Sequence, residues 1–125
     1  MDNKKKILIV DDEKDFTEMI KWNLEATGQY EVRSESKGAK ALAAAREFIP
    51  HLILLDIIIP DMDGGAILFQ LKNDVATKDI PLVFLTAIVT QPEVNSVGKL
   101  ISGYPSIAKP VSAADLIAYI KNAIG

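Results

Sequence analysis

The sequence predicts an α/β fold in which helices cover both faces of a doubly wound, five-stranded parallel sheet. Short, continuous apolar segments alternate five times with segments of helical periodicity. Such alternation is typical of parallel strands joined by right-handed helical crossovers. The length of 125 residues, with 49% hydrophobic and 25% charged residues, suits one globular domain. We therefore expect residues 1–125 to form a single domain.

The five predicted strands are short apolar stretches bounded by polar residues or proline. Three are continuous enough to be buried on both faces, namely ILIV (7–10), LILL (52–55) and LVFL (82–85). Two are weaker candidates, YEV (30–32) and PSIA (105–108).

The first three predicted helices follow the first three strands. The helix over 13–27 ends at Gly28, a favourable C-terminal cap, and its apolar stripe consists of Phe16, Met19, Ile20 and Leu24. The second covers the alanine-rich residues 37–49, and the third runs from about 64 to 74.

Two further helices are predicted from their N-terminal caps. TQPE (90–93) is a capping box with proline in the first turn, and it opens a helix with the apolar residues Val94, Val97, Leu100 and Ile101. SAAD (112–115) opens the last helix.

Composition excludes several function classes. The net charge of −3 gives no electrostatic reason for this domain to bind nucleic acid. The chain has no cysteine, so disulfides and thiolate metal sites are excluded. No apolar run is long enough for a signal peptide or a membrane span, so we expect a cytoplasmic protein without membrane contact.

Polar side chains follow four of the five predicted strands. Asp11, Asp12 and Glu13 follow the first strand, Asp56 the third, Thr86 and Ala87 the fourth, and Lys109 and Pro110 the fifth. The carboxyl ends of parallel strands share one edge of the sheet, where ligands of doubly wound folds bind. We therefore expect these residues to converge, although each carboxylate taken alone would also suit a solvated cap.

This predicted cluster has an excess of negative charge. Asp11, Asp12 and Asp56 would repel one another in a partly desolvated cleft, and Lys109 alone cannot neutralise them. A divalent cation would restore the balance, and ligands that are all oxygen favour a hard ion such as Mg²⁺.

Four motifs occur in the order expected for a known family: VDDE (10–13), LLDIIIPDMDG (54–64), LTA (85–87) and KP (109–110). On the basis of these motifs, essentially the whole chain resembles the receiver domain of two-component response regulators. The resemblance implies a flavodoxin-like fold of the chemotaxis-regulator type, with strand order 2-1-3-4-5 and five helices. It also implies that Asp56 accepts a phosphoryl group from the phosphohistidine of a sensor histidine kinase or a histidine phosphotransfer protein. Such a domain catalyses only its own phosphorylation and slow dephosphorylation, so we do not expect an enzyme.

The resemblance assigns a role to each site residue. Asp12 and Asp56 would bind Mg²⁺ directly, Asp11 mainly through water, and Ile58 through its backbone carbonyl. Lys109 would pair with the phosphoryl group, and the Thr86 hydroxyl would turn inward to bond it. Lys109 and Pro110 would be joined by a cis peptide, which an X-Pro bond permits. The output surface would be the fourth helix, the fifth strand and the fifth helix, in a monomer or weak homodimer.

One position departs from the family pattern, and two others bear on the lifetime of the phosphoryl group. Ser106 stands three residues before the lysine, where receivers that switch through an aromatic residue carry Tyr or Phe. We therefore expect the signal to pass through residues 87–105 by another rearrangement. Ile58 and Ile88 stand two residues after Asp56 and Thr86, at positions that tune phosphoryl lifetime. Because neither aliphatic side chain can orient an attacking water, we expect slow self-dephosphorylation.

Three other functions are alternatives for a chain of this pattern. A phosphatase of the haloacid-dehalogenase type needs a second Asp where this chain has Ile58. A flavodoxin needs a Ser/Thr/Gly-rich phosphate loop where this chain has DDEKD (11–15). A pseudo-receiver, which is a non-phosphorylated interaction module, usually lacks an acidic residue or the lysine, and it is the alternative retained. The chain is either a stand-alone receiver or part of a longer protein, and Met1 favours a natural N-terminus.

Overall fold

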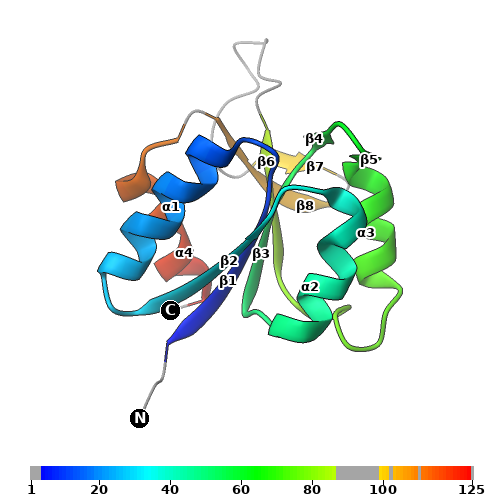
Figure 1. Cartoon of the computed structure of the whole chain (residues 1–125), viewed down its shortest axis with the longest axis horizontal. Coiled ribbons are helices and arrows are strands. Elements are labelled where there is room, and N and C mark those ends of the chain that lie inside the picture. The colour runs from blue at the N-terminus through cyan, green and yellow to red at the C-terminus, as the bar shows by residue number, and fades with distance from the viewer. Residues whose placement is uncertain (1–3, 87–98, 102, 110, 125) are drawn as a thin grey trace.

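The computed structural model describes residues 4–86, 99–101, 103–109 and 111–124. A six-stranded sheet forms the centre of the molecule (Figure 1), and its strands in chain order are β1 (Lys5–Val10), β2 (Tyr30–Glu35), β3 (Leu52–Asp56), β6 (Leu82–Thr86), β7 (Lys99–Ile101) and β8 (Tyr104–Ala108). A separate two-stranded hairpin consists of β4 (Ile58–Ile59) and β5 (Met62–Asp63).

The sheet order is β2-β1-β3-β6-β8-β7, and the first five of these strands are parallel. They are the second, first, third, fourth and fifth predicted strands. The structure therefore confirms the flavodoxin-like order 2-1-3-4-5.

Four α-helices lie within the described residues: α1 (Lys14–Ala26), α2 (Ala41–Phe48), α3 (Gly64–Lys72) and α4 (Ala113–Ile124). A short 3₁₀ helix, η1 (Gly38–Lys40), leads into α2. Figure 1 shows α1 and α4 on one face of the sheet and α2 and α3 on the other. None of these helices is long and apolar enough to cross a membrane.

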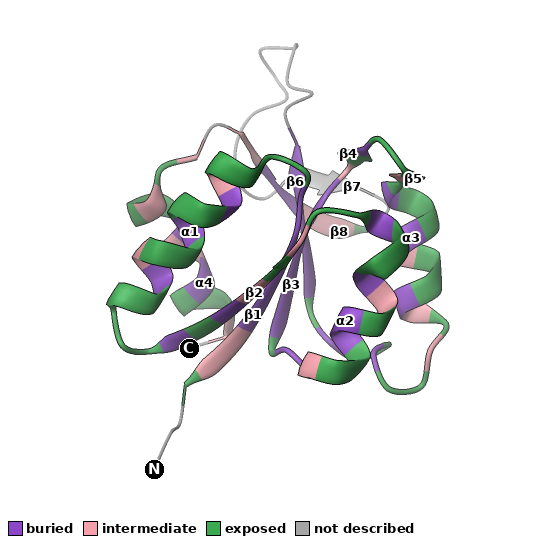
Figure 2. Cartoon of the chain, viewed as in Figure 1, coloured by how far each residue is buried: buried purple, intermediate pink, exposed green. Residues whose placement is uncertain are grey.

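Alternate residues of the central strands feed two hydrophobic cores. Ile7 and Ile9 of β1 face the core beneath α1 and α4, whereas Leu8 and Val10 face the core beneath α2 and α3. All four of these side chains are fully buried. Figure 2 shows buried residues along the central strands and exposed residues on the outer sides of the helices.

The first and last helices begin or end where the sequence predicts. Gly28 takes a φ of 77° just after α1, a left-handed conformation that glycine adopts without strain. The Ser112 hydroxyl accepts a hydrogen bond from the Asp115 amide at 3.1 Å, which caps α4. Met19, however, is 38% exposed and does not belong to the buried stripe of α1, where Thr17 is buried instead.

The fourth predicted helix is wrong at its C-terminal end. Leu100 and Ile101 belong to β7, which pairs antiparallel with β8. Gly103, with a φ of 85°, makes the tight connection between the two strands. The pairing also supplies hydrogen-bond partners for an edge of β8 that would otherwise be open. The predicted beginning of that helix, within 87–98, lies outside the described residues.

Candidate functional site

Three carboxylates lie together at the carboxyl edge of the sheet, as the sequence predicts. Asp11 and Asp12 directly follow β1, and Asp56 is the last residue of β3. One oxygen of each lies within 4.8 Å of one from each of the others. Asp11 and Asp56 are buried, whereas Asp12 is exposed. We call these three residues the acidic cluster.

Lys109 reaches the acidic cluster from the end of β8, nearly a hundred residues further along the chain. Its ammonium lies 2.9 Å from Asp11 Oδ2 and 3.6 Å from Asp56 Oδ2. The backbone of Lys109 is held by a short hydrogen bond, because its amide donates to the Thr86 carbonyl at 2.7 Å. The parallel pairing of β6 and β8 therefore positions the Lys109 side chain next to the acidic cluster.

The two oxygens of Asp56 have different surroundings. Oδ1 accepts a hydrogen bond from the Ile58 amide at 3.1 Å, while Oδ2 faces Lys109. Burial and the neighbouring charge of Asp11 raise the pKa of Asp56 to about 6, although the Ile58 amide and Lys109 oppose this rise. Ionisation of Asp56 is therefore less favourable in the folded protein than in water.

Lys109 is itself nearly buried, with a side chain only 7% exposed. Burial lowers the pKa of Lys109, but hydrogen bonds to Glu13 and Asp11 outweigh that effect and raise it above its ordinary value. Lys109 therefore keeps its positive charge across the neutral pH range.

Two residues that contact the Lys109 side chain were not predicted from the sequence to do so. Glu13 forms an ion pair with its ammonium, and the ring centroid of Phe16 lies 4.6 Å from Nζ. The sequence signal for Glu13 was its place in VDDE, directly after the first strand. Phe16 appeared there only as a helix-face residue, because spacing along α1 cannot reveal a contact with the end of β8.

The remaining predicted site residues fall in different places. Thr86 ends β6 and is buried, and Ser106 is buried in β8 opposite Phe84 of β6. Ile58 begins the β4–β5 hairpin, and its side chain is 58% exposed. Ala87, Ile88 and Pro110, with the predicted cis peptide, lie outside the described residues.

Tyr104 lies on β8 two residues before Ser106, and it is half-buried. Its ring contacts Phe84 edge-on, with centroids 6.4 Å apart, and the Lys72 ammonium lies 5.3 Å from its centroid. Tyr104 thus packs against the α2–α3 core at the edge of the sheet.

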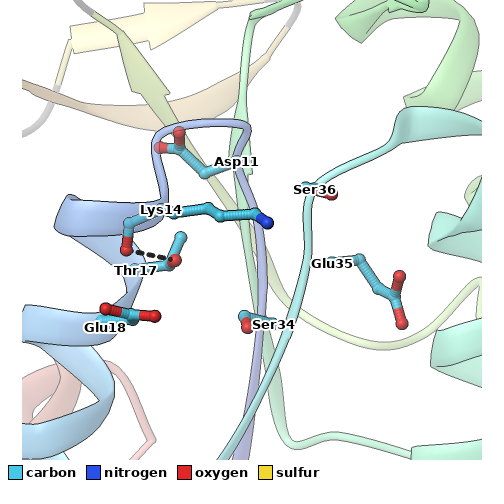
Figure 3. Close-up of a pocket in the computed structure, with 7 residues that line it drawn as sticks. All are labelled: Asp11, Lys14, Thr17, Glu18, Ser34, Glu35 and Ser36. Atoms are coloured by element: carbon cyan, nitrogen blue, oxygen red, sulfur yellow. Dashed lines mark hydrogen bonds between the residues drawn. The ribbon is translucent and has the colours of Figure 1, made fainter.

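A polar cleft of about 270 Å³ adjoins the acidic cluster between α1 and the end of β2 (Figure 3), and it is lined by Asp11, Lys14, Thr17, Glu18, Ser34, Glu35 and Ser36. The Thr17 hydroxyl donates its proton to the Lys14 carbonyl at 3.0 Å, so that proton is already engaged within α1. Asp11 is shared between the cleft and the acidic cluster, so the two are continuous.

Comparison with known proteins agrees with this geometry. The family model of the response regulator receiver domain matches residues 7–121. The phosphate regulon transcriptional regulatory protein PhoB of Pseudomonas aeruginosa is 40% identical over 118 residues, which cover 94% of this chain and 50% of that protein. The DNA-binding dual master transcriptional regulator RpaA of Synechocystis is 31% identical over 121 residues, covering 93% of this chain and 47% of that protein.

A solved structure shares the fold over nearly its whole length. The chemotaxis response regulator CheY4 of Vibrio cholerae has a TM-score of 0.79 and 27% identity, and the match covers 95% of this chain and 98% of that one. The chain spans about half the length of the two curated relatives. The chain belongs to the response regulator receiver domain family of two-component systems.

Proposed function

We propose that this receiver domain accepts a phosphoryl group on Asp56, in a Mg²⁺-dependent transfer from the phosphohistidine of a sensor histidine kinase or histidine phosphotransfer protein. The observation that carries the proposal is the position of Asp56. Its carboxylate ends β3 beside two further carboxylates, with the ammonium of Lys109 at 3.6 Å. Phosphoryl transfer depends mainly on positioning and charge neutralisation, and this arrangement is suited to both.

The donor set fits a magnesium ion. Asp11, Asp12 and Asp56 offer only oxygen ligands. Burial, and after it the charge of Asp11, raises the pKa of Asp56, and a bound cation would oppose both effects by stabilising the ionised carboxylate. Asp12 and Asp56, with the carbonyl of Ile58, would hold the ion, and Asp11 would act mainly through water. The bound ion would supply positive charge against the phosphoryl oxygens.

In the proposed reaction, the chain supplies the nucleophile and holds the reacting groups in position. An oxygen of the ionised Asp56 attacks phosphorus, a new O–P bond forms, and the P–N bond to the donor histidine breaks with its electron pair going to the imidazole. The Ile58 amide, bonded to Oδ1 at 3.1 Å, orients the carboxylate. Lys109, held by Asp11 and Glu13, brings positive charge toward the transferred group.

The residues beside Asp56 favour a persistent phosphoryl mark. Ile58 presents an exposed aliphatic side chain two residues after Asp56, and it has no polar atom with which to orient a water. We propose slow self-dephosphorylation, and no turnover of external substrates, as the catalytic behaviour of this domain.

Output is proposed to pass to a protein partner rather than to nucleic acid, since the chain has a net charge of −3. Ser106 replaces the usual switch aromatic, and Tyr104 already packs against Phe84. The route would run through residues 87–105 to a surface that includes β8 and α4, in a monomer or weak homodimer. An inward flip of Tyr104 on phosphorylation would refute this route.

Incubation with acetyl phosphate and Mg²⁺, followed by intact-mass measurement, tests the proposed function. The wild-type chain should gain the mass of one phosphoryl group, and Asp56→Asn should not. The pseudo-receiver alternative predicts no gain in either protein, although the acidic cluster and Lys109 are all in place.

A further inference from the structure

Asp61 forms a clamp between the β4–β5 hairpin, which begins two residues after Asp56, and the start of η1. It lies in the turn of the β4–β5 hairpin, between the paired residues Ile59 and Met62. Its Oδ1 accepts a hydrogen bond from the Gly38 amide at 2.8 Å, and its Oδ2 accepts one from the Ala39 amide at 3.0 Å. One exposed carboxylate therefore uses both oxygens to bind a segment 22 to 23 residues earlier in the chain.

The donor segment has no local cap of its own. Lys37 precedes η1 and makes no side-chain capping bond. The Gly38 and Ala39 amides are among the first N–H groups of η1, which have no partner within the helix. Asp61 supplies the missing acceptor from a different loop, and the bonds to both amides lower its pKa.

Close packing supports the same contact. A Cβ added at Gly38 would lie 2.9 Å from Met62 Cβ and 2.5 Å from Ile67 Cδ1. The hairpin and the start of η1 therefore meet without room for a side chain. This approach places Asp61 within hydrogen-bond distance of two successive amides.

The clamped hairpin is the segment that carries the proposed metal-binding carbonyl. Ile58 pairs with Asp63 in the hairpin, only two residues after Asp56. At the base of the hairpin, the Gly64 amide donates to the Ile57 carbonyl at 3.1 Å. At its turn, the only hydrogen bonds that the described residues provide to another element are those of Asp61.

We propose that Asp61 is a positioning residue, which holds the β4–β5 hairpin against η1 and so keeps the Ile58 carbonyl in place for Mg²⁺. The inference rests on the proposed function only in the choice of metal ligands. Removing a residue that holds a metal ligand in place typically weakens metal binding by 10- to 100-fold. Because Asp61 acts through the backbone of a hairpin, we expect the lower end of that range.

The test compares Asp61→Ala and Asp61→Asn with a matched control, Asp74→Ala, in the full chain. Asp74 also accepts bonds from a backbone amide and a second element, at 2.8 Å from Ala76 and 2.7 Å from Arg46 Nε, but it lies outside the acidic cluster. Mg²⁺ affinity is measured by calorimetry, and NMR reports the Ile58 amide shift on Mg²⁺ addition and the exchange rates of the Gly38 and Ala39 amides.

Asp61→Ala should weaken Mg²⁺ binding about tenfold, accelerate exchange at both amides, and change the Ile58 response to Mg²⁺. Asp61→Asn keeps one carbonyl acceptor and should lie between Asp61→Ala and the wild type, which also provides a measurement if the alanine variant fails to fold. Asp74→Ala should bind Mg²⁺ as the wild type does. Phosphorylation of Asp61→Ala by acetyl phosphate should be slow at low Mg²⁺ and recover when Mg²⁺ is saturating.

Three results would overturn the inference: unchanged exchange at Gly38 and Ala39, unchanged Mg²⁺ affinity despite faster exchange, or an equal loss of affinity in Asp74→Ala. A different result would count against the proposed function alone. If the wild type binds Mg²⁺ but takes no phosphoryl group, while Asp61→Ala binds Mg²⁺ more weakly, the clamp stands and the proposed function fails.

Discussion

Replacing Asp56 with Asn should stabilise the metal-free protein at neutral pH. Asp56 is 6% exposed, and burial with the charge of Asp11 raises its pKa from 3.8 to about 6. A change of one pKa unit is worth about 1.4 kcal/mol, so ionised Asp56 costs the folded state about 3 kcal/mol. Asn is similar in shape and keeps an acceptor for the Ile58 amide, but it carries no charge.

The sign of the pH dependence follows from the direction of this shift. The folded chain binds the Asp56 proton more tightly than the unfolded chain does, so stability falls as pH rises from about 4 to about 6. Above that range the full cost is present, and Asp56→Asn removes it. We expect the variant to be about 3 kcal/mol more stable at pH 7.5, with the difference reduced to about 0.5 kcal/mol at pH 4.

Urea unfolding in EDTA, followed by far-ultraviolet circular dichroism between pH 4 and pH 7.5, measures this difference. Asp74→Asn is the control, because hydrogen bonds from Arg46 and Ala76 lower the pKa of Asp74. That variant should be less stable than the wild type at neutral pH, and the deficit should shrink on acidification. An Asp56→Asn variant that is less stable than the wild type at pH 7.5 would show that ionised Asp56 does not destabilise the folded protein.

Three further variants probe the site and its support. Lys109→Met leaves Asp11 buried without its cation and should cost about 3 kcal/mol in urea unfolding without metal, whereas no loss would show that the pair contributes nothing. Gly64→Ala should cost about 1–3 kcal/mol by the same assay, because its Cβ would lie 2.7 Å from the Ile57 carbonyl oxygen, while Gly65→Ala meets only a movable carboxylate and should cost less. Ile58→Asn should shorten the lifetime of the phosphorylated protein several-fold by orienting water, as followed by intact mass, and a wild-type half-life of only seconds would contradict the proposed persistence.

The sequence predicted the structure best where a local pattern of apolar and polar residues determines it. Continuous apolar runs located the buried strands, and the polar residues after them located the acidic cluster, because parallel strands end at one edge. Asp56 is an instance: the apolar run LILL predicted a strand, and β3 ends on the aspartate itself. Local patterns of this kind need no knowledge of distant contacts.

Features that depend on contacts between distant segments were missed. The spacing of Leu100 and Ile101 suits a helix, but the two residues pair with β8. The sequence around them does not show that β8 has an open edge for them to pair with. The hydrogen bonds from Gly38 and Ala39 to Asp61 likewise depend on how η1 meets the hairpin. Sequence spacing alone cannot supply that geometry.

Phosphorylation of Asp56 is tested most directly by intact-mass measurement after incubation with acetyl phosphate and Mg²⁺. We expect a gain of about 80 Da, the mass of one phosphoryl group, in the wild type, with no gain in Asp56→Asn or when EDTA replaces Mg²⁺. An unmodified wild-type chain, or an equal gain in Asp56→Asn, would contradict it.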